Sequence, residues 1–403
     1  MSLAVITVGE AMRLPELHPP AWTPGRELVD SVARIITDVR ARGDAALGTK
    51  ALRVAVPMIE GARTFVPPEI ADGLRLSRER LTRFYERQRN ADLNYVDEDG
   101  TRYGMRYRPF ESVAIHVVGG SAASSVLLAA VPARVAGVGR VIALAQPNEE
   151  GAIHPAVMYA AALCEIDELY RIGGPAAIAA AAYGTDSVAR VDKIVGGGSA
   201  DVVEAKRQIS GVCAIDGLGS APDVLVIADD GANSEFVAGE LLAQAERDPL
   251  ARVAVVSESR PLLEAVAQLL DTLDVRTLER GDIICAVLSR SAHFMYASAR
   301  DEIFEVVDRF APSRVSLQVR DAEPYLGRLR RVGAVYVGDQ TPLVCGPYLA
   351  GTHDLRLSDF TYSYTVVENS RERMEHDAHA LAALAEFEGL PEHAQSARMR
   401  GGN

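Results

Sequence analysis

The sequence has few aromatic residues, few cysteines, no excess of basic charge and no long hydrophobic run. Its formal net charge of −13 leaves no basic stripe for a phosphate backbone, so nucleic acid is not an expected partner. No apolar run could cross a bilayer, and the first residues lack the basic region and apolar core of a signal peptide, so no membrane partner is expected. The cysteines lack any C-x-x-C pair, which favours free thiols in a cytoplasmic protein: Cys164, Cys213, Cys285 and Cys345.

Small apolar residues are abundant instead. Hydrophobic residues make up 48% of the chain although aromatics reach only 6%, which fits the interior of parallel sheets. From residue 113, strand-like segments alternate with helical ones, which predicts an α/β protein with right-handed crossovers. The series is too long for one small sheet, so two Rossmann-like halves are expected. The predicted strands are 113–117, 141–147, 168–174, 191–195, 224–230, 252–257, 282–288 and 332–337, and further helices are predicted over 27–50, 67–89 and 370–400.

The stretch Lys193–Lys206 joins a buried strand, three glycines and a helix. Gly196, Gly197 and Gly198 let the backbone turn sharply, and Ser199 or Asp201 can cap a helix that starts near residue 200. Free N–H groups and the helix dipole at such a turn can bind an anion. A purely structural turn is the alternative, because the glycines match neither the dinucleotide fingerprint nor a P-loop.

Several stretches together resemble the histidinol dehydrogenase family, over residues 29–393. They include VAIHVVGGSAASSVLL (113–128), VDKIVGGGSADVVEAKR (191–207), LLAQAERDP (241–249), DRFAPSRVSLQV (308–319) and AGTHDL (350–355). The resemblance implies a homodimer of two incomplete Rossmann-like domains with parallel sheets, whose helical N- and C-terminal segments exchange between subunits. It also implies zinc-dependent oxidation of an amino alcohol to an amino acid with NAD.

On this basis we expect an N-terminal segment over 1–25 and a first Rossmann-like domain, with preceding helices, over 26–112 and 224–345. The second Rossmann-like domain is expected over 113–223. The highly charged helical tail, 346–403, is expected to pack on the neighbouring subunit.

The positions of the family's zinc ligands are mostly altered. Gln244 and His393 match two of them, but Arg247 replaces a histidine and Pro347 replaces an aspartate. Zinc prefers nitrogen, sulfur or carboxylate donors, and a guanidinium repels it, so we expect no metal site. The family's catalytic Glu-His pair is replaced as well, with Arg314 at the histidine. Arginine stays protonated and cannot shuttle protons near neutral pH.

These changes leave three hypotheses. In the first, the chain is an enzyme of altered, non-redox chemistry in specialised metabolism, acting on a small anionic, amino-acid-derived molecule. Its expected binding residues are Arg247, Arg314, Gln244, Ser124 and Ser125, and its acid–base candidates are His116, His353, Asp354, His393 and Glu246. Ion pairs of the arginines with Glu246, Asp248 or Asp354 are the alternative. In the second hypothesis, a dehydrogenase binds NAD through Gly196–Ser199 with a new base. In the third hypothesis, the chain is a non-catalytic relative of the family that binds a molecule or has a regulatory role.

Overall fold

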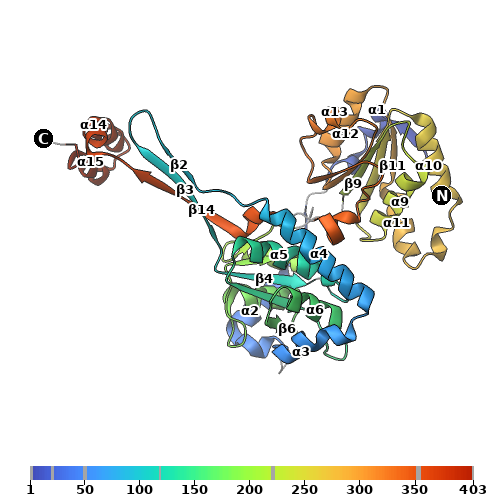
Figure 1. The fold of residues 1–403 in the computed structure, drawn as a ribbon, viewed down its shortest axis with the longest axis horizontal. Helices are drawn as coiled ribbons and strands as arrows, with labels where there is room; N and C mark the ends of the chain where they lie inside the picture. The colour runs from blue at the N-terminus through green and yellow to red at the C-terminus, as the bar shows by residue number, and fades with distance from the viewer. Residues whose placement is uncertain are drawn as a thin grey trace.

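The computed structural model describes residues 3–19, 22–48, 52–117, 119–218, 223–350 and 355–401, without the side chains of residues 349 and 350. Two lobes, each built on a parallel sheet, lie side by side, and an arm projects from one of them (Figure 1). The α/β class with parallel sheets and helical segments at both ends, as expected from the sequence, is confirmed.

The small lobe contains the sheet β6-β5-β4-β7-β8. Its strands are β4 (Ser112–Val117), β5 (Arg140–Ala145), β6 (Glu168–Tyr170), β7 (Lys193–Val195) and β8 (Ala214–Ile215). One face packs on α3 (Val56–Gly61), α4 (Pro68–Glu86), α5 (Ala123–Ala136) and α6 (Pro155–Leu163). The other packs on α2 (Arg26–Arg42), α7 (Gly174–Tyr183) and α8 (Ala200–Ile209). Successive residues of β4 alternate between these faces, as the pleat requires: Val113 and Ile115 contact the first layer, Ala114 the second.

The large lobe contains the sheet β1-β11-β10-β9-β12-β13. Its strands are β1 (Val5–Thr7), β9 (Asp223–Ala228), β10 (Arg252–Ser257), β11 (His293–Tyr296), β12 (Arg314–Gln318) and β13 (Ala334–Val337). Helices α9 (Ser234–Ala245), α10 (Arg260–Thr272) and α11 (Gly281–Ser291) cover one face. The other face packs on helices α1 (Val8–Ala11), α12 (Arg300–Phe310) and α13 (Glu323–Leu326).

The arm combines an antiparallel sheet with two helices. Strands β2 (Leu93–Val96), β3 (Arg102–Pro109) and β14 (Thr361–Glu368) form the sheet, and α14 (Arg371–Phe387) and α15 (Pro391–Arg398) lie at its tip. Figure 1 shows these helices far from the large lobe. Apolar side chains are exposed along the arm, and Phe387 is 91% exposed. Within this single chain, the arm therefore leaves apolar surface uncovered.

A buried ion pair fastens the N-terminal segment to the large sheet. The Arg252 guanidinium donates to Asp223 at 2.8 Å and to the backbone carbonyls of Glu16, Leu17 and Phe310 at 3.2, 3.3 and 2.9 Å. Both side chains of the pair are buried, and every contact is charge-assisted.

The structure divides the chain differently from the expected domains. Helices α2 and α4, within 26–112, pack on the small sheet rather than on the sheet of residues 224–345. The first 25 residues supply β1 to the large sheet, where it pairs in parallel with β11. The predicted strand 282–288 is instead part of α11, whose buried Ile284, Val287 and Leu288 recur at helical spacing.

Candidate functional site

Gln244 and Arg314 meet at the amino edge of the large sheet. Arg314 is the first residue of β12, and Gln244 lies in the last turn of α9, which returns along the sheet to the same edge. An Arg314 Nη1 proton points to Gln244 Oε1 at 3.5 Å, and the two residues are only 5% and 2% exposed. Residues far apart in sequence, expected together from the resemblance, thus contact each other.

The Arg314 guanidinium is a buried charge with a weak partner. The 3.5 Å separation exceeds the usual range of about 2.7–3.2 Å for N–H···O bonds. Among the described residues, no carboxylate lies within ion-pair distance of it. Burying a charge without a counter-charge is costly, so an anion bound here would gain a favourable interaction. The predicted alternative partner Asp354, like His353, lies outside the described residues.

Glu240 is a buried acid that the sequence analysis missed. It lies one turn before Gln244 on α9, and burial raises the pKa of its carboxyl group. The Leu343 N–H donates to Glu240 Oε1 at 3.0 Å, which fixes the segment that leads into the turn Gly346–Ala350, where Pro347 lies. One feature of the sequence could have indicated this acid: Glu240 lies four residues before Gln244, on a helix face that is otherwise apolar.

Arg247, Glu246 and Asp248 follow the end of α9. Arg247 and Glu246 are exposed, and neither takes part in the hydrogen bond between Gln244 and Arg314. Arg247 has an interaction partner, and Asp248 accepts a hydrogen bond from the Leu250 N–H at 2.7 Å. The structure therefore separates the two predicted anion-binding arginines into one buried and one exposed group.

In the small lobe, the glycine turn after β7 is held by an ion pair. The Gly196 N–H donates to Asp216 Oδ2 at 2.7 Å, and Lys206 Nζ donates to the Gly196 carbonyl at 3.0 Å while pairing with Asp216. A Cβ at Gly196, where φ is +112°, would lie 2.2 Å from the His116 carbonyl oxygen. Only glycine fits there.

The predicted binding serines of this lobe make local contacts within the chain. Ser199 is the N-cap of α8, but its side chain contacts Asp201, whose Oδ1 accepts from the Val202 N–H at 2.9 Å. Ser124 and Ser125 lie half-buried in the first turn of α5, and Ser125 Oγ donates to the Ala122 carbonyl at 2.7 Å.

Both ring nitrogens of His116 are occupied. Nδ1 lies 2.8 Å from the Gly197 carbonyl oxygen, and Nε2 accepts from the Gly174 N–H at 3.2 Å. The residue is 5% exposed, and burial is the main cause that lowers its pKa. The ring has no nitrogen left for a substrate in this arrangement, which argues against the predicted acid–base role.

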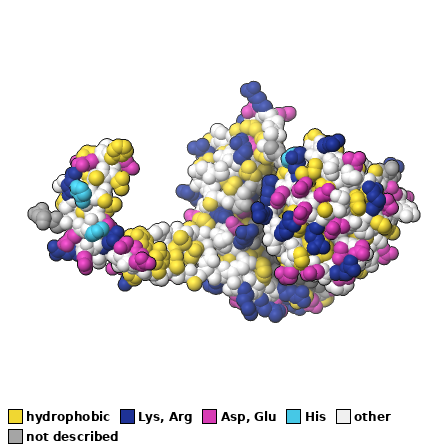
Figure 2. All heavy atoms as spheres, turned by 90° about the horizontal axis from the view of Figure 1, so that it is seen from above, with side chains coloured by type: hydrophobic (Ala, Val, Ile, Leu, Met, Phe, Trp, Pro, Cys, Tyr) yellow, Lys and Arg dark blue, Asp and Glu magenta, His cyan; other side chains and the backbone are white. Residues whose placement is uncertain are grey.

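The two lobes are joined at the sheet edges that carry these groups. The chain leaves the carboxyl edge of the small sheet at Asp216 and enters the amino edge of the large sheet at Asp223. Seven residues span at most about 25 Å, so these two edges are no farther apart than that where the chain passes between them. Figure 2 shows a groove between the lobes with basic side chains along it. His393, on the exposed side of α15, lies at the opposite end of the molecule from α9 (Figure 1).

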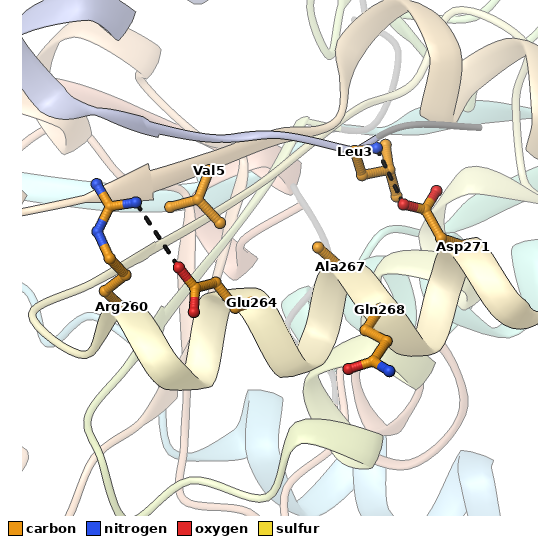
Figure 3. A pocket seen from close by; sticks show the side chains of 7 residues that line it. All are labelled: Leu3, Val5, Arg260, Glu264, Ala267, Gln268 and Asp271. Carbon is orange, nitrogen blue, oxygen red and sulfur yellow. Dashed lines mark hydrogen bonds and ion pairs between the residues drawn. The ribbon is translucent and has the colours of Figure 1, made fainter.

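A separate hollow lies at the outer edge of the large sheet (Figure 3). Its volume is about 350 Å³, and β1 and α10 form its walls. Its charges already have partners: Arg260 pairs with Glu264 at 3.8 Å, and Asp271 accepts from the Leu3 N–H at 3.2 Å. None of the candidate site residues lines it.

The residues at the Gln244 position do not fit a zinc ion. Gln244 offers one neutral amide oxygen, and that oxygen faces the Arg314 guanidinium. A catalytic zinc site needs about three protein donors, and a fixed cation beside one of them opposes a second cation. In the described part of the chain, no three His, Cys, Asp or Glu residues cluster as a metal site would require. The described helices also include none long and apolar enough to span a membrane.

Known proteins resemble this chain over nearly its whole length. The histidinol dehydrogenase family model matches residues 23–401. Histidinol dehydrogenases of Mesorhizobium japonicum and Gluconobacter oxydans are 37% and 35% identical, over 92% and 93% of both chains. The crystal structure of histidinol dehydrogenase from Elizabethkingia anophelis superposes with a TM-score of 0.92 at 25% identity, covering 98% of this chain and 96% of that one. The chain therefore belongs to the histidinol dehydrogenase family.

Proposed function

We propose that this chain is an enzyme of the histidinol dehydrogenase family with altered, zinc-independent chemistry on a small anionic, amino-acid-derived molecule. One observation carries the proposal: Arg314 is a buried guanidinium whose described partner is a neutral amide at 3.5 Å. A ligand carboxylate would supply the missing negative charge. The planar fork of arginine suits a carboxylate or phosphate better than a neutral alcohol.

In this proposal, Gln244 and Glu240 support the arginine. The Gln244 amide accepts one guanidinium proton and so orients the remaining donors, while Glu240 holds the backbone of residue 343 beside the same helix. A charge-assisted hydrogen bond contributes about 1.5–3 kcal/mol, so a bidentate contact accounts for a substantial part of small-molecule affinity. Exposed Arg247 would act at the entrance.

The reaction class proposed is non-redox, such as cyclisation, isomerisation, condensation or elimination. Neither arginine transfers protons near neutral pH. His353 with Asp354, and His393 from a second subunit, are the proposed proton carriers, because the ring of His116 is engaged by two backbone groups.

The test uses a matched pair of probes, L-histidine and L-histidinol, which differ in the carboxylate. Calorimetric titration of the metal-free protein should give at least tenfold tighter binding of L-histidine. Arg314→Ala should abolish that preference, whereas Arg314→Lys should retain part of it. Equal affinities for the two probes, or unchanged L-histidine binding by Arg314→Ala, would overturn the proposal. Loss of that preference in Arg314→Lys as well would show that the guanidinium fork itself is needed.

A second candidate function is NAD-dependent oxidation with a replaced base. The strand order of the small sheet reverses between β4 and β7, and open α/β sheets bind ligands beyond the carboxyl ends of strands at such a point. The turn before α5 has room there, since a Cβ at Gly119 or Gly120 would meet no heavy atom within 4 Å. NAD, when bound, would supply the hydride acceptor, and Gly196–Ser199 would hold its phosphates. Titration with NAD, with and without zinc, decides: binding supports this function, and no binding in either condition retires redox chemistry.

We further propose a homodimer in which the arms are exchanged. The support is the apolar surface that the arm leaves exposed, including Val367, Leu384 and Phe387, and the distance of His393 from α9 in one chain. Sedimentation of the full chain should give a dimer, and deletion of 361–403 should give monomers. A monomeric full chain would refute this arrangement.

A further inference from the structure

The small lobe contains a histidine that joins two turns from different parts of the sheet. We propose that His116 is a positioning residue: its neutral ring links the turn that ends at Gly174, the first residue of α7, to the turn before α8 and thereby sets the shape of the carboxyl edge of the small sheet. This inference goes beyond the proposed function and does not depend on which ligand binds.

The two contacts dictate the tautomer of the ring. The Gly197 carbonyl oxygen can only accept, so the ring nitrogen 2.8 Å away, Nδ1, carries the proton. The Gly174 N–H can only donate, so Nε2 presents its lone pair at 3.2 Å. Only the neutral Nδ1–H form satisfies both. The assignment follows from the chemistry of the partners and needs no observed hydrogen positions.

The place of His116 in the sheet gives these contacts their effect. It lies on β4, the central strand, and its side chain points to the layer of α7 and α8. Gly197 follows the neighbouring strand β7, whereas Gly174 follows β6, two strands away on the other side. The His116 ring therefore reaches across the carboxyl edge of the small sheet. It links the starts of α7 and α8, which follow separate strands.

The turns on either side have little freedom of their own. A Cβ at Gly173 would lie 2.3 Å from Gln146 Oε1, and one at Gly198 would lie 2.6 Å from the Val202 side chain. Such close packing leaves each turn with few alternative positions. Because this packing remains, loss of one His116 hydrogen bond should expose only the backbone group that it bonded, without a general collapse of the lobe.

Protonation would break one of the two ties. The ionisable groups that act on His116 are Lys206 and Asp201 of α8 and Asp216 after β8, with Lys206 opposing and the two acids favouring a positive ring. A protonated Nε2 would face the Gly174 N–H donor to donor. Acid should therefore release the turn before α7 first, while the Nδ1–H bond to Gly197 persists.

Three variants separate the two ties. His116→Asn can keep a donor near the Nδ1 position but loses the acceptor for Gly174, whereas His116→Gln can place its side-chain oxygen near the Nε2 position. His116→Phe keeps packing and loses both bonds. We expect hydrogen exchange of the Gly174 amide to accelerate at least tenfold in the Asn and Phe variants and to stay slow in the Gln variant.

Two further measurements complete the test. Nitrogen NMR of ¹⁵N-histidine-labelled wild-type protein should show the Nδ1–H tautomer for His116, assigned through its bonded connectivity to the backbone of residue 116. An Nε2–H tautomer would overturn the inference, and this measurement needs no variant. Unchanged protection of Gly174 in His116→Phe would overturn it too. As the pH is lowered and His116 becomes protonated, the affinity of the wild-type protein for L-histidine should fall more steeply than the affinity of His116→Gln. If L-histidine does not bind at all, the proposed function fails, while the exchange and tautomer results still decide the role of His116.

Discussion

Replacing Arg314 by methionine should stabilise the ligand-free protein and abolish anion binding at the same time. Arg314 is 5% exposed, and its contact with Gln244 is long, so this contact offsets little of the cost of burying its charge. Replacing poorly compensated buried ions by apolar side chains of similar volume is often neutral or stabilising by about 1–4 kcal/mol. The denaturation midpoint of Arg314→Met in urea should accordingly rise, whereas added L-histidine should raise the midpoint of the wild type alone.

Arg252 provides a matched control in the same sheet. It is buried to a similar degree, but an Asp223 carboxylate and three carbonyl oxygens surround its guanidinium. Arg252→Met would leave Asp223 buried and unpaired, which should cost about 3–5 kcal/mol of unfolding free energy. If Arg314→Met destabilises the protein as strongly as Arg252→Met, then Arg314 has an internal anionic partner, and the argument for a ligand anion is refuted.

Three further outcomes are expected from other parts of the structure. Gly196→Ala should lower the free energy of unfolding by about 1–3 kcal/mol, because its Cβ would meet the His116 carbonyl at 2.2 Å in a backbone conformation that suits glycine; an unchanged urea midpoint would contradict this. Lys206→Met should destabilise by about 1–3 kcal/mol, since it leaves the half-buried Asp216 without its cation, and the double variant with Asp216→Asn should recover part of the loss in the same urea titration. Glu240 has a raised pKa in the folded protein, so its contribution to stability is fully present below the unfolded-state pKa of about 4.3 and is lost as pH rises through the folded-state pKa. Above the folded-state pKa, Glu240→Gln should therefore be more stable relative to wild type than it is at low pH. Parallel curves of stability against pH for the two proteins from pH 4 to 8 would contradict this.

Much of the architecture could be predicted from the sequence because parallel strands carry a local signal. Strands such as 113–117 and 252–257 are short apolar runs bounded by turns, and the structure contains them. The run 282–288 was predicted wrongly because the six consecutive apolar residues after Asp282 suit a strand or a buried helix equally well. Its buried positions, three and four apart, become evident only when α11 packs on the sheet.

The site was less predictable because its important contacts join distant residues. Gln244 and Arg314 were expected together from the family resemblance, and they do contact each other. His116 looked like a potential base, but its partners lie 58 and 81 residues away, and no local pattern indicates that both nitrogens are occupied. Glu240 was overlooked for a similar reason, since its hydrogen-bond partner, Leu343, is 103 residues distant.

The position of β1 has a consequence for how this protein is made. The first strand of the large sheet pairs with β11, almost 290 residues later, while all strands of the small sheet fall between 112 and 215. During synthesis, all strands of the small sheet have been made before most of the large lobe has left the ribosome, although Leu355, Leu357 and Phe360 of its core follow only later. Contacts between near residues form sooner than those between remote ones. The N-terminal residues must therefore wait, unpaired, until the chain has passed residue 296. A delay between the synthesis of β11 and its pairing with β1 would leave the edge of β11 exposed, so the order of translation and the order of assembly are linked in this fold.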